Sequence, residues 1–397
     1  MIQKVTEIKD LKGKRVLVRV DFNVPMKKKK ILDDARIKAG GFSIQYLRKK
    51  GAKVIVVTHL GRPEGKKVSD LSLAPIAKHL EKLLTGLKEK KVKVSLLQDI
   101  FGEKEMATLK KMKPGGVVMF ENIRFYKEEE KNDEDFARQL ASLADVFVMD
   151  GFSVAHRDAA SVSGVAKFLP SYAGFLLVRE INALDTLLGK PKKPFTAVIG
   201  GAKIETKLPV IKNILKVANT VLLGGALFNT YLTSRGYGVG ASLVDAVEKK
   251  YLLALNKKQV IKAVDVVVGK KDGAYARVVP IKNKAHAICE KDEMILDIGP
   301  KTIKIFEKYI AKSKTLVWNG AMGYFENEMF AEGTFAIARA VEVQGRKYNF
   351  VLVGGGETLE VMQMLKLPPT TYQISTAGGA MLEYLSGKKL PGLKNLA

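Results

Sequence analysis

Two lysines near the middle of the chain follow an apolar run that ends in glycines. In FTAVIGGAKIETK, residues 195–207, the run stops at Gly200 and Gly201, and Lys203 and Lys207 come next. Glycine turns expose backbone N–H groups, and a lysine beside them adds a positive charge, so the stretch suits a phosphate. The spacing differs from the Gly-x-x-x-x-Gly-Lys-Ser/Thr of a P-loop, which the chain does not contain.

The first half of the chain carries a second, mostly cationic set of side chains, which come after apolar runs. Arginine matches a phosphate or carboxylate with two hydrogen bonds. Several such cations at one point repel each other without an anion between them, so the set indicates a small, highly charged ligand such as a phosphorylated acid. The alternative, surface or interdomain salt bridges, explains single positions better than the whole series. The set comprises Asp21, Asn23, Arg36, His59, Arg62, Arg124, His156 and Arg157.

Glycines follow the apolar runs of the second half. In VGGGETLEVMQML, residues 353–365, three glycines end a run, and Glu357 and Thr358 open an amphipathic helix. Helix N-termini attract phosphate, and a carboxylate there can help to hold Mg²⁺. The alternative is a plain strand-to-helix turn with a capping threonine or glutamate. RGYGVG, residues 235–240, follows a helical pattern, so a dinucleotide fingerprint is discounted there.

The elements that position these residues alternate along the chain. Near-continuous Val/Ile/Leu runs such as RVLVRVDF, DVVVG and MILDIGP are typical of strands buried on both faces, and hence of parallel sheets. Amphipathic stretches such as LSLAPIAKHLEKLL separate them. The alternation predicts doubly wound α/β sheets, which bind ligands at the carboxyl ends of their strands. About eleven runs are too many for one open sheet, so we expect two.

We therefore expect two Rossmann-like domains joined by one helix, with a cleft between them. The helical pattern lies within residues 172–190. The segment GKPKKP ends it, because proline lacks a donor and clashes with the preceding turn.

Composition restricts the partners and the compartment. The 397 residues include 67 Lys and Arg against 41 Asp and Glu, a formal net charge of +26, which favours an anionic partner. A nucleic acid is the alternative to a small ligand, but no RNA-binding or helix-turn-helix signature supports it. A lone cysteine, Cys289, excludes an intramolecular disulfide and fits a reducing cytosol. Neither the first ten residues nor residues 217–234, the longest uncharged run, have the composition of a signal or membrane segment.

Ten stretches, in order and at compatible spacing, resemble the phosphoglycerate kinase family from near the first residue to the last. They are RVDFNVP, RIKA, THLGRP, ENIRFYKEE, FSVAHR, GGAKIETK, DIGPKT, WNGAMGYFE, GGGET and STAGGAMLEYLSGKKLPG. The resemblance implies a glycolytic and gluconeogenic enzyme that transfers a phosphoryl group reversibly from 1,3-bisphosphoglycerate to MgADP, giving 3-phosphoglycerate and MgATP. A kinase of another carboxylic acid is the alternative, and THLGRP, ENIRF and AHR argue against it.

The resemblance also implies a division of the chain. Residues 1–171 would form the phosphoglycerate-binding domain, 172–190 the interdomain helix, 191–376 the nucleotide-binding domain, and 377–397 a segment that returns to the first domain. It implies a cytoplasmic monomer that closes around 3-phosphoglycerate and ATP with Mg²⁺, and that binds neither nucleic acid nor a membrane.

Site residues carry over from the family by position. Arg36, Lys203 and Gly356 would be catalytic, with Arg36 beside the reacting carboxylate and Lys203 bridging to the transferred group. The mostly cationic set of the first half would hold the phosphoglycerate, and Glu357 would hold the metal. The nucleotide would meet Gly201, Ala202, Lys203, Lys207, Gly225, Asn319, Glu326, Gly354, Gly355, Gly356, Glu357 and Thr358.

Several positions depart from the common family pattern. MDGFSVAHR stands where DAFGTAHR is common, which puts Ser153 at a glycine position near the phosphoglycerate, where it would crowd the site or add a hydrogen bond. Ala321 replaces a proline, Glu357 replaces an aspartate at the metal, and Ala377 replaces a glycine in a segment expected to flex at closure. Since none of these changes removes a charge, we expect altered rates and metal affinity rather than loss of activity.

Overall fold

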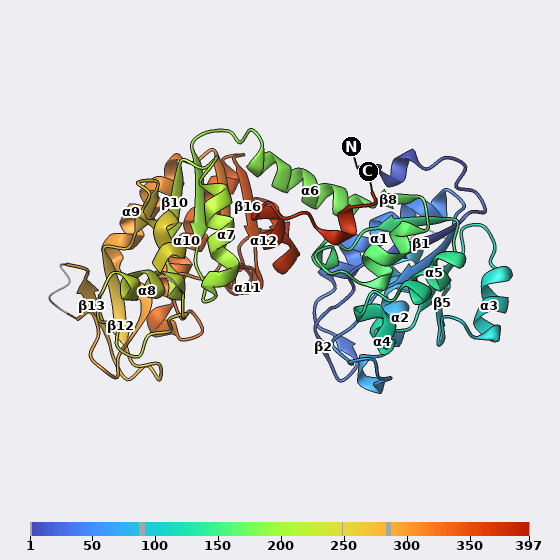
Figure 1. Ribbon diagram of the computed structural model, residues 1–397, viewed down its shortest axis with the longest axis horizontal. Coiled ribbons are helices and arrows are strands. Elements are labelled where there is room, and N and C mark those ends of the chain that lie inside the picture. Colours follow the sequence, from blue (N-terminus) through green and yellow to red (C-terminus); the bar gives the residue numbers. More distant parts are fainter. Residues whose placement is uncertain (1, 87–91, 248, 283–286, 397) are drawn as a thin grey trace. The chain divides into compact units, whose positions relative to one another are not determined.

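The chain consists of two compact units. The computed structural model describes residues 2–86, 92–247, 249–282 and 287–396. Unit 1 comprises Met1–Asn182 with Lys389–Ala397, and unit 2 comprises Ala183–Lys388. The chain passes between the units twice, first within helix α6 (Phe175–Leu188) and again after Lys388. Figure 1 shows the elements of both units in the colours of the sequence.

Six parallel strands form the centre of unit 1, in the order β5-β6-β4-β1-β7-β8. Their bounds are β1 Arg15–Arg19, β4 Lys53–Val57, β5 Val94–Leu97, β6 Val117–Phe120, β7 Val146–Met149 and β8 Ser171–Ala173. Val16, Leu17 and Val18 of β1 are fully buried. Both faces of this strand are therefore covered, which is the usual state of a parallel sheet.

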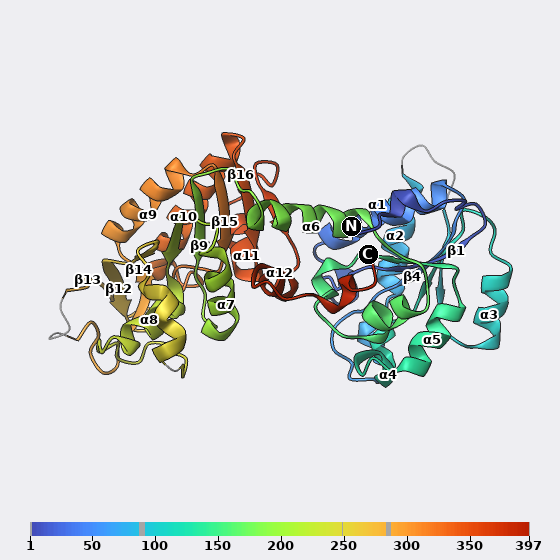
Figure 2. The ribbon, with the colours of Figure 1, turned by 45° about the horizontal axis from the view of Figure 1, so that its top comes forward.

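Helices cover the two faces of the unit 1 sheet. In Figure 2, α1 and α2 lie on one side of β1 and β4, and α5 lies on the other. The helices of this unit are α1 Ala35–Lys49, α2 Ala74–Thr85, α3 Glu103–Lys110, α4 Lys127–Glu130 and α5 Glu134–Ser142. A short hairpin joins β2 (Met26–Lys27) to β3 (Lys30–Ile31).

Helix α5 illustrates how the local sequence sets these elements. Asp133 caps its N-terminus, because the carboxylate accepts a hydrogen bond of 2.9 Å from the amide of Phe136. Phe136, Ala137 and Leu140 follow at helical spacing and are buried. The apolar stripe thus packs toward the sheet while Glu134 and Arg138 stay exposed and pair with each other.

Short segments of 3-10 or π helix connect many of these elements. In unit 1 they are η1 Val5–Glu7, η2 Ser69–Leu71, η3 Ile123–Phe125, η4 Phe152–Val154, η5 Ala160–Gly164, η6 Val165–Lys167 and η9 Pro391–Leu393. In unit 2 they are η7 Lys249–Asn256 and η8 Glu328–Phe330.

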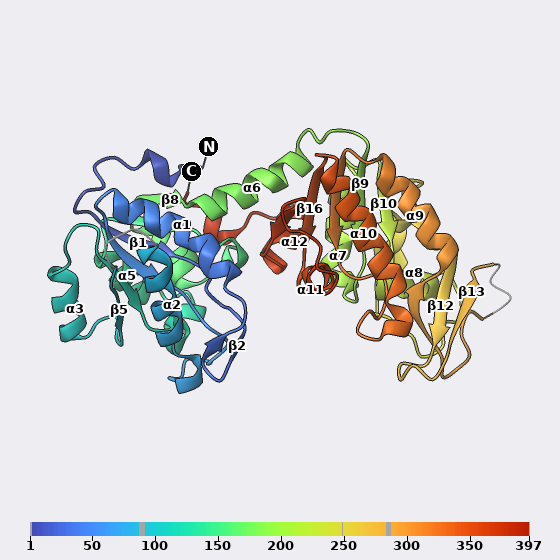
Figure 3. The same cartoon turned by 180° about the vertical axis from the view of Figure 1, so that it is seen from behind.

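A second parallel sheet forms the centre of unit 2, in the order β11-β10-β9-β15-β16-β17. Its strands are β9 Phe195–Ile199, β10 Thr220–Leu223, β11 Val260–Lys262, β15 Thr315–Asn319, β16 Phe350–Gly354 and β17 Gln373–Ser375. The helices are α7 Ile204–Ile214, α8 Gly225–Ser234, α9 Pro300–Lys312, α10 Glu332–Arg346, α11 Gly356–Met364 and α12 Gly379–Leu385. Helices cover both faces, since α7 is nearest the viewer in Figure 1, whereas α9 and α10 are nearest in Figure 3.

Two of the predicted strands do not join a parallel sheet. DVVVG and MILDIGP form β12 (Asp265–Gly269) and β14 (Met294–Ile298), which pair antiparallel with each other and with β13 (Ala276–Pro280) in a separate three-stranded sheet of the order β13-β12-β14. The expectation of parallel pairing was therefore wrong for these two runs. Helices α9 and α10 pack on this small sheet, so β12 and β14 are as apolar as parallel core strands.

The two chain ends of unit 1 lie together. The amide of Gln3 donates to the carbonyl of Leu396 over 2.8 Å, and Gly392 donates to the carbonyl of Ala155 over 2.8 Å. In the described part of the chain, helices with the length and apolar character needed to cross a bilayer are absent.

Candidate substrate and nucleotide sites

A cluster of charged residues lies at the carboxyl ends of three neighbouring strands in unit 1. Asp21 follows β1, His59 follows β4, and Arg124 lies in η3 after β6. Because the strands are parallel and β4 pairs with both β1 and β6, their ends meet at one edge of the sheet. Arg36 approaches from the first turn of α1.

Asp21 is the centre of this cluster. Its Oδ2 accepts a hydrogen bond of 2.7 Å from Nη1 of Arg36 and another from the hydroxyl of Ser153. Its Oδ1 accepts from the amide of Asn23 over 3.0 Å and lies 3.9 Å from Nδ1 of His59. Asp21 is only 5% exposed, whereas the side chain of Arg36 is 32% exposed. The buried carboxylate thus holds a guanidinium group that remains accessible.

For both Asp21 and His59, burial and the charge of the other residue shift the pKa in opposite directions. Burial raises the pKa of Asp21, but His59, Arg36, and hydrogen bonds from Ser153 and the Asn23 amide outweigh it, so the pKa lies below its ordinary value. Burial lowers the pKa of His59 well below its ordinary value, with Asp21 opposing. At neutral pH we therefore expect a neutral imidazole, whose charge then no longer acts on Asp21, and an Asp21 carboxylate that Arg36 and its hydrogen bonds keep ionised.

The remaining cationic residues differ in how firmly they are held. Nη1 of Arg124 donates to the carbonyl of Gly61 over 2.7 Å, and its Nε lies 3.2 Å from Oε1 of Glu130. The amide of Gly61 donates to Oδ1 of Asn23 over 3.0 Å, which ties the loop after β4 to the segment after β1. Arg62 is exposed on that loop.

Arg157 and His156 follow η4. Arg157 is exposed, and its charge lowers the pKa of Arg124 in addition to the effect of burial, so the two guanidinium groups lie near each other. His156 is half-buried beside Arg157 in the chain. The structure thus brings Asp21, Asn23, Arg36, His59, Arg124 and Arg157 into one cluster. Arg62 and His156 adjoin it through their chain neighbours.

Arg19 belongs to the same region and was missed from the sequence. It is fully buried on β1, where Nε donates to Oγ of Ser161 over 2.8 Å and Nη2 lies 4.0 Å from Oε1 of Glu129. Its Nη2 lies 3.5 Å from Nδ1 of His59. The sequence signal was a charged residue inside the apolar run RVLVRVDF. Burying a charge is unfavourable unless another polar group compensates it, so this arginine indicates a buried hydrogen-bonding or charged partner.

The glycine turns of unit 2 meet at a single edge of its sheet. The amide of Gly201 donates to the carbonyl of Ala321 over 2.7 Å, and the amide of Gly225 donates to the carbonyl of Met322 over 3.0 Å. Gly225 has φ +66°, and a Cβ there would lie 2.6 Å from the amide nitrogen of Gly201. Only glycine allows the turns after β9 and β10 to approach so closely.

The turn after β16 joins the same edge. Thr358, which is fully buried, accepts a hydrogen bond of 2.8 Å from the amide of Gly320. Asn319 donates through Nδ2 to the carbonyl of Gly354 over 2.7 Å, and its Oδ1 accepts from Nζ of Lys207. Helix α11 begins at Gly356, after Gly355 with φ +103°, and Glu357 is exposed in its first turn.

These residues border two cavities in unit 2. One of about 220 Å³ is lined by Lys203, Lys207, Asn319, Gly320, Gly355 and Thr358 among others. The other, of about 280 Å³, is mostly apolar and includes Gly225 and Glu326. Gly201, Ala202 and Glu357 line both, so the two cavities adjoin. Neither lining includes Gly354 or Gly356, although both belong to the adjoining turn.

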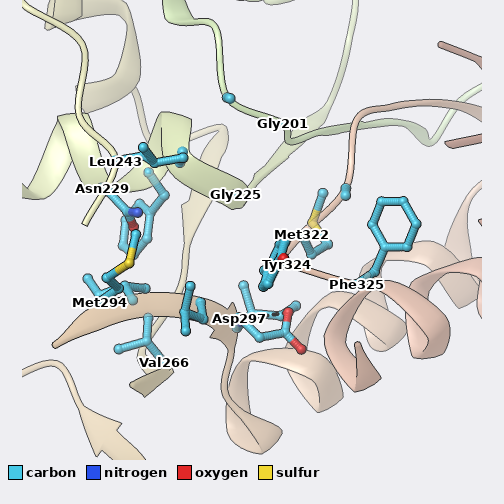
Figure 4. A pocket seen from close by; sticks show the side chains of 18 of the residues that line it. Gly201, Gly225, Asn229, Leu243, Val266, Met294, Asp297, Met322, Tyr324 and Phe325 are labelled. Carbon is cyan, nitrogen blue, oxygen red and sulfur yellow. Dashed lines mark hydrogen bonds between the residues drawn. The ribbon is translucent and has the colours of Figure 1, made fainter. Parts of the chain in front are cut away.

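The apolar cavity contains side chains that the sequence did not single out. Figure 4 shows Leu243, Val266 and Met294 on one side of it and Met322, Tyr324 and Phe325 on the other. Asp297 lies in its lining and is almost fully buried, which raises the pKa of its carboxyl group to about 8 although the amides of Ile298 and Gly333 donate to it. The mostly apolar lining of one cavity suits a flat, largely apolar group, and the lysines and glycine turns of the other suit phosphates.

Charge in the polar cavity comes from two lysines and one carboxylate. Lys207 is 8% exposed, and burial lowers its pKa to about 8, with the charge of Glu357 opposing. Lys203 is exposed at the N-terminus of α7. Within residues 2–86, 92–247, 249–282 and 287–396, no three His, Cys, Asp or Glu side chains gather as a metal site.

Two α/β units, one with a cationic cluster and the other with a glycine-lined edge, form an arrangement that suits a phosphotransferase. The model of the family described as Phosphoglycerate kinase matches residues 5–388. The chain belongs to the phosphoglycerate kinase family, and it is therefore a kinase.

Named relatives and solved structures agree with this family. The chain is 46% identical to the phosphoglycerate kinase of Dictyoglomus turgidum over 97% of this chain and 96% of that protein. It is 44% identical to the phosphoglycerate kinase of Pelotomaculum thermopropionicum over 100% of this chain and 99% of that protein. The phosphoglycerate kinase structure from Coxiella burnetii superposes with a TM-score of 0.84 at 38% identity, covering 100% of this chain and 99% of that one. The phosphoglycerate kinase structure from Pyrococcus horikoshii superposes with a TM-score of 0.81 at 32% sequence identity, covering 100% of this chain and 98% of that one.

Proposed function

We propose that the enzyme transfers a phosphoryl group reversibly between 1,3-bisphosphoglycerate and MgADP, giving 3-phosphoglycerate and MgATP. The observation that carries this proposal is the Asp21–Arg36 pair, in which a buried carboxylate fixes an accessible guanidinium at the centre of a cationic cluster. Such chemistry depends on alignment and charge stabilisation more than on covalent catalysis.

The cluster in unit 1 would hold the phosphoglycerate. Arg124 and Arg157 repel each other in the free protein, and an anion between them relieves that repulsion. Their guanidinium forks fit a phosphate, with Arg62 and His156 adjoining. His59 is neutral at physiological pH by its lowered pKa, so it would serve as a hydrogen-bonding group rather than as a charge. Arg36 would face the reacting carboxylate.

The two cavities in unit 2 would hold the nucleotide. The apolar cavity suits the base, and the polar cavity suits the phosphates because amides, Lys203 and Lys207 surround it. Lys203 would bridge to the transferred phosphoryl group, and Gly356 at the start of α11 would offer a bare amide to it. The ring of Tyr324 and the side chains of Met294 and Met322 would contact the base.

Mg²⁺ would be held by Glu357 together with the nucleotide phosphates. Magnesium typically takes one or two protein carboxylates plus substrate oxygens. Glu357 meets that requirement, since it lines both cavities and its charge reaches Lys207. When bound, the ion would neutralise charge on the phosphates.

Transfer also requires the two substrates to meet, although their sites lie on separate units. We therefore propose that the units close around them and exclude water. We also propose that the enzyme acts as a cytoplasmic monomer; the lone cysteine of the sequence, Cys289, suits a reducing compartment. Light scattering on the purified protein would test the monomer.

A direct assay tests the activity. ADP release from MgATP should require 3-phosphoglycerate, and unphosphorylated glycerate should not replace it because the guanidinium groups of Arg124 and Arg157 would lack their anion. Equal ADP release with and without 3-phosphoglycerate would refute the proposal. Strong turnover with another carboxylic acid would favour a kinase of different acceptor specificity.

A further inference from the structure

The segment from Gly151 to Ser153 holds Asp21 in two ways. A Cβ at Gly151 would lie 3.3 Å from the amide nitrogen of Asp21 and 3.1 Å from Cγ2 of Val154, so this glycine packs against the Asp21 backbone. Two residues later, in η4, the hydroxyl of Ser153 donates to the Asp21 side chain. The backbone and the carboxylate of Asp21 are thus both contacted by one short segment.

This chain departs from the common family pattern at both ends of that segment. DGFS stands where DAFG is common, so the glycine and the larger residue have exchanged places. The Cβ that is lost at position 151 is the one that would crowd the Asp21 amide, and the hydroxyl gained at position 153 reaches its carboxylate. The two departures therefore bear on a single residue.

The oxygen that Ser153 contacts is the one that holds Arg36. Nη1 of Arg36 lies 2.7 Å from Oδ2 of Asp21, while Oδ1 accepts from the Asn23 amide over 3.0 Å. Contacts from α1, from η4 and from the segment after β1 thus fix the plane of the carboxylate. Without the hydroxyl, Oδ2 would be oriented by a guanidinium whose side chain is itself one-third exposed.

We propose that Ser153 is a positioning residue for phosphoryl transfer, because its hydroxyl holds the Asp21 carboxylate and thereby aims Arg36 at the reacting acid. This inference rests on the proposed function. The competing explanation is steric, in which the hydroxymethyl group only narrows a site where the family commonly has glycine. The two explanations differ in whether the oxygen atom or the bulk of the side chain matters.

Steady-state kinetics of full-length variants separate them. Ser153→Ala should lower kcat/KM for 3-phosphoglycerate roughly tenfold, the size expected when a hydrogen bond to a charged group is lost. Ser153→Gly should show a similar loss, and Ser153→Thr, which keeps the hydroxyl, should retain most of the wild-type value. KM for MgATP should not change in any of them, since the proposed nucleotide residues belong to unit 2. Ser142→Ala, at an exposed serine on α5, is the matched control.

Three results from the variants would overturn the proposal. Wild-type kinetics in Ser153→Ala would show that the hydroxyl is not used. Faster turnover in Ser153→Gly, with Ser153→Ala unchanged, would establish the steric explanation. Equal losses for both substrates together with a lower Tm would indicate a purely structural role. A wild-type enzyme that does not phosphorylate 3-phosphoglycerate at all would refute the proposed function itself, and this inference with it.

Discussion

Lys207 reaches from α7 to the end of β15, where its Nζ donates a hydrogen bond to Oδ1 of Asn319. Asn319 donates in turn to the carbonyl of Gly354 over 2.7 Å, so the ammonium group is fixed relative to the turn after β16. Burial lowers the pKa of Lys207 to about 8, although the charge of Glu357 opposes the shift. A lysine with this pKa can lose its charge within the working range of an enzyme.

We expect kcat/KM for MgATP to fall as the pH rises through about 8, because the free enzyme then loses the Lys207 charge. Bound phosphates favour the protonated amine, so the corresponding decrease in kcat should occur at higher pH. Lys207→Arg should abolish the decrease in kcat/KM, since arginine stays charged. pH profiles of both parameters measure this, and a flat kcat/KM profile in the wild type would contradict the assignment.

The same shift predicts how stability depends on pH. Between about 8 and its ordinary value of 10.5, Lys207 binds a proton in the unfolded chain that it does not bind in the folded one. The free energy of unfolding should therefore gain from this residue as the pH rises through that window. Urea titrations of the wild type and Lys207→Met across these pH values isolate the contribution, and it should be missing in the variant.

Replacing Lys203 tests whether its positive charge stabilises the transferred phosphoryl group. It is exposed at the N-terminus of α7, so its replacement should leave the fold intact. We expect Lys203→Ala to lower kcat by roughly 10²-fold, the scale of losing one preorganised charge in a transition state. Lys308→Ala, at an exposed lysine on α9, is the control for net charge and should be unchanged. Near-normal turnover in Lys203→Ala would rule out the bridging role.

Replacing Arg36 tests whether its guanidinium group acts on the reacting carboxylate of 3-phosphoglycerate. Arg36→Ala removes the accessible guanidinium and the charge that faces Asp21, and we expect kcat to fall by roughly 10²-fold. Arg36→Lys should recover little, because a lysine cannot reproduce the fork. Arg138→Ala, at an exposed arginine on α5, serves as the control. If only the Michaelis constant for 3-phosphoglycerate changed, Arg36 would bind the substrate without stabilising the transfer.

Replacing Glu357 tests whether its carboxylate helps to hold Mg²⁺. Glu357→Asp restores the shorter carboxylate that is common in the family. We expect it to shift the Mg²⁺ concentration for half-maximal activity more than it shifts the Michaelis constant for 3-phosphoglycerate. Glu360→Asp, at an exposed residue of the same helix, is the matched control. Isothermal titration of Mg²⁺ into the ADP complex gives a readout independent of turnover. Identical metal titrations in Glu357→Asp and wild type would argue against metal binding there.

The sequence predicted the two parallel sheets because strands buried on both faces select Val, Ile and Leu. It could not predict the direction of β12 and β14, since apolar runs covered by helices look the same whether the strands pair parallel or antiparallel. Polar residues at strand ends could be located because parallel strands bring their carboxyl ends to one edge.

Other parts of the sites depend on contacts that no local pattern contains. The hydrogen bond between Ser153 and Asp21 joins residues 132 positions apart. Met294 and Met322 line a cavity, yet their types are those of any core residue. Arg19 was hidden inside a strand, where its partners Ser161 and Glu129 come from other segments. In each case the tertiary fold supplies the information.

Arg19 therefore provides a prediction on stability. It is fully buried beside Glu129, whose carboxylate also accepts from the amide and hydroxyl of Ser161 over 2.8 and 2.6 Å. Arg19→Met leaves that buried carboxylate without its cation, and we expect the free energy of unfolding to fall by about 3 kcal/mol, the lower end for breaking a buried ion pair.

Arg15 on the same strand is the matched control, because it pairs with Asp145 at 2.6 Å but its side chain is 40% exposed. Arg15→Met should cost at most about 1 kcal/mol, as is usual for exposed pairs. In the double variant Arg19→Met with Glu129→Gln, part of the loss should return, since the uncompensated charge is gone. Equal losses from Arg15→Met and Arg19→Met in urea unfolding would show that burial of Arg19 adds nothing to the strength of its ion pair.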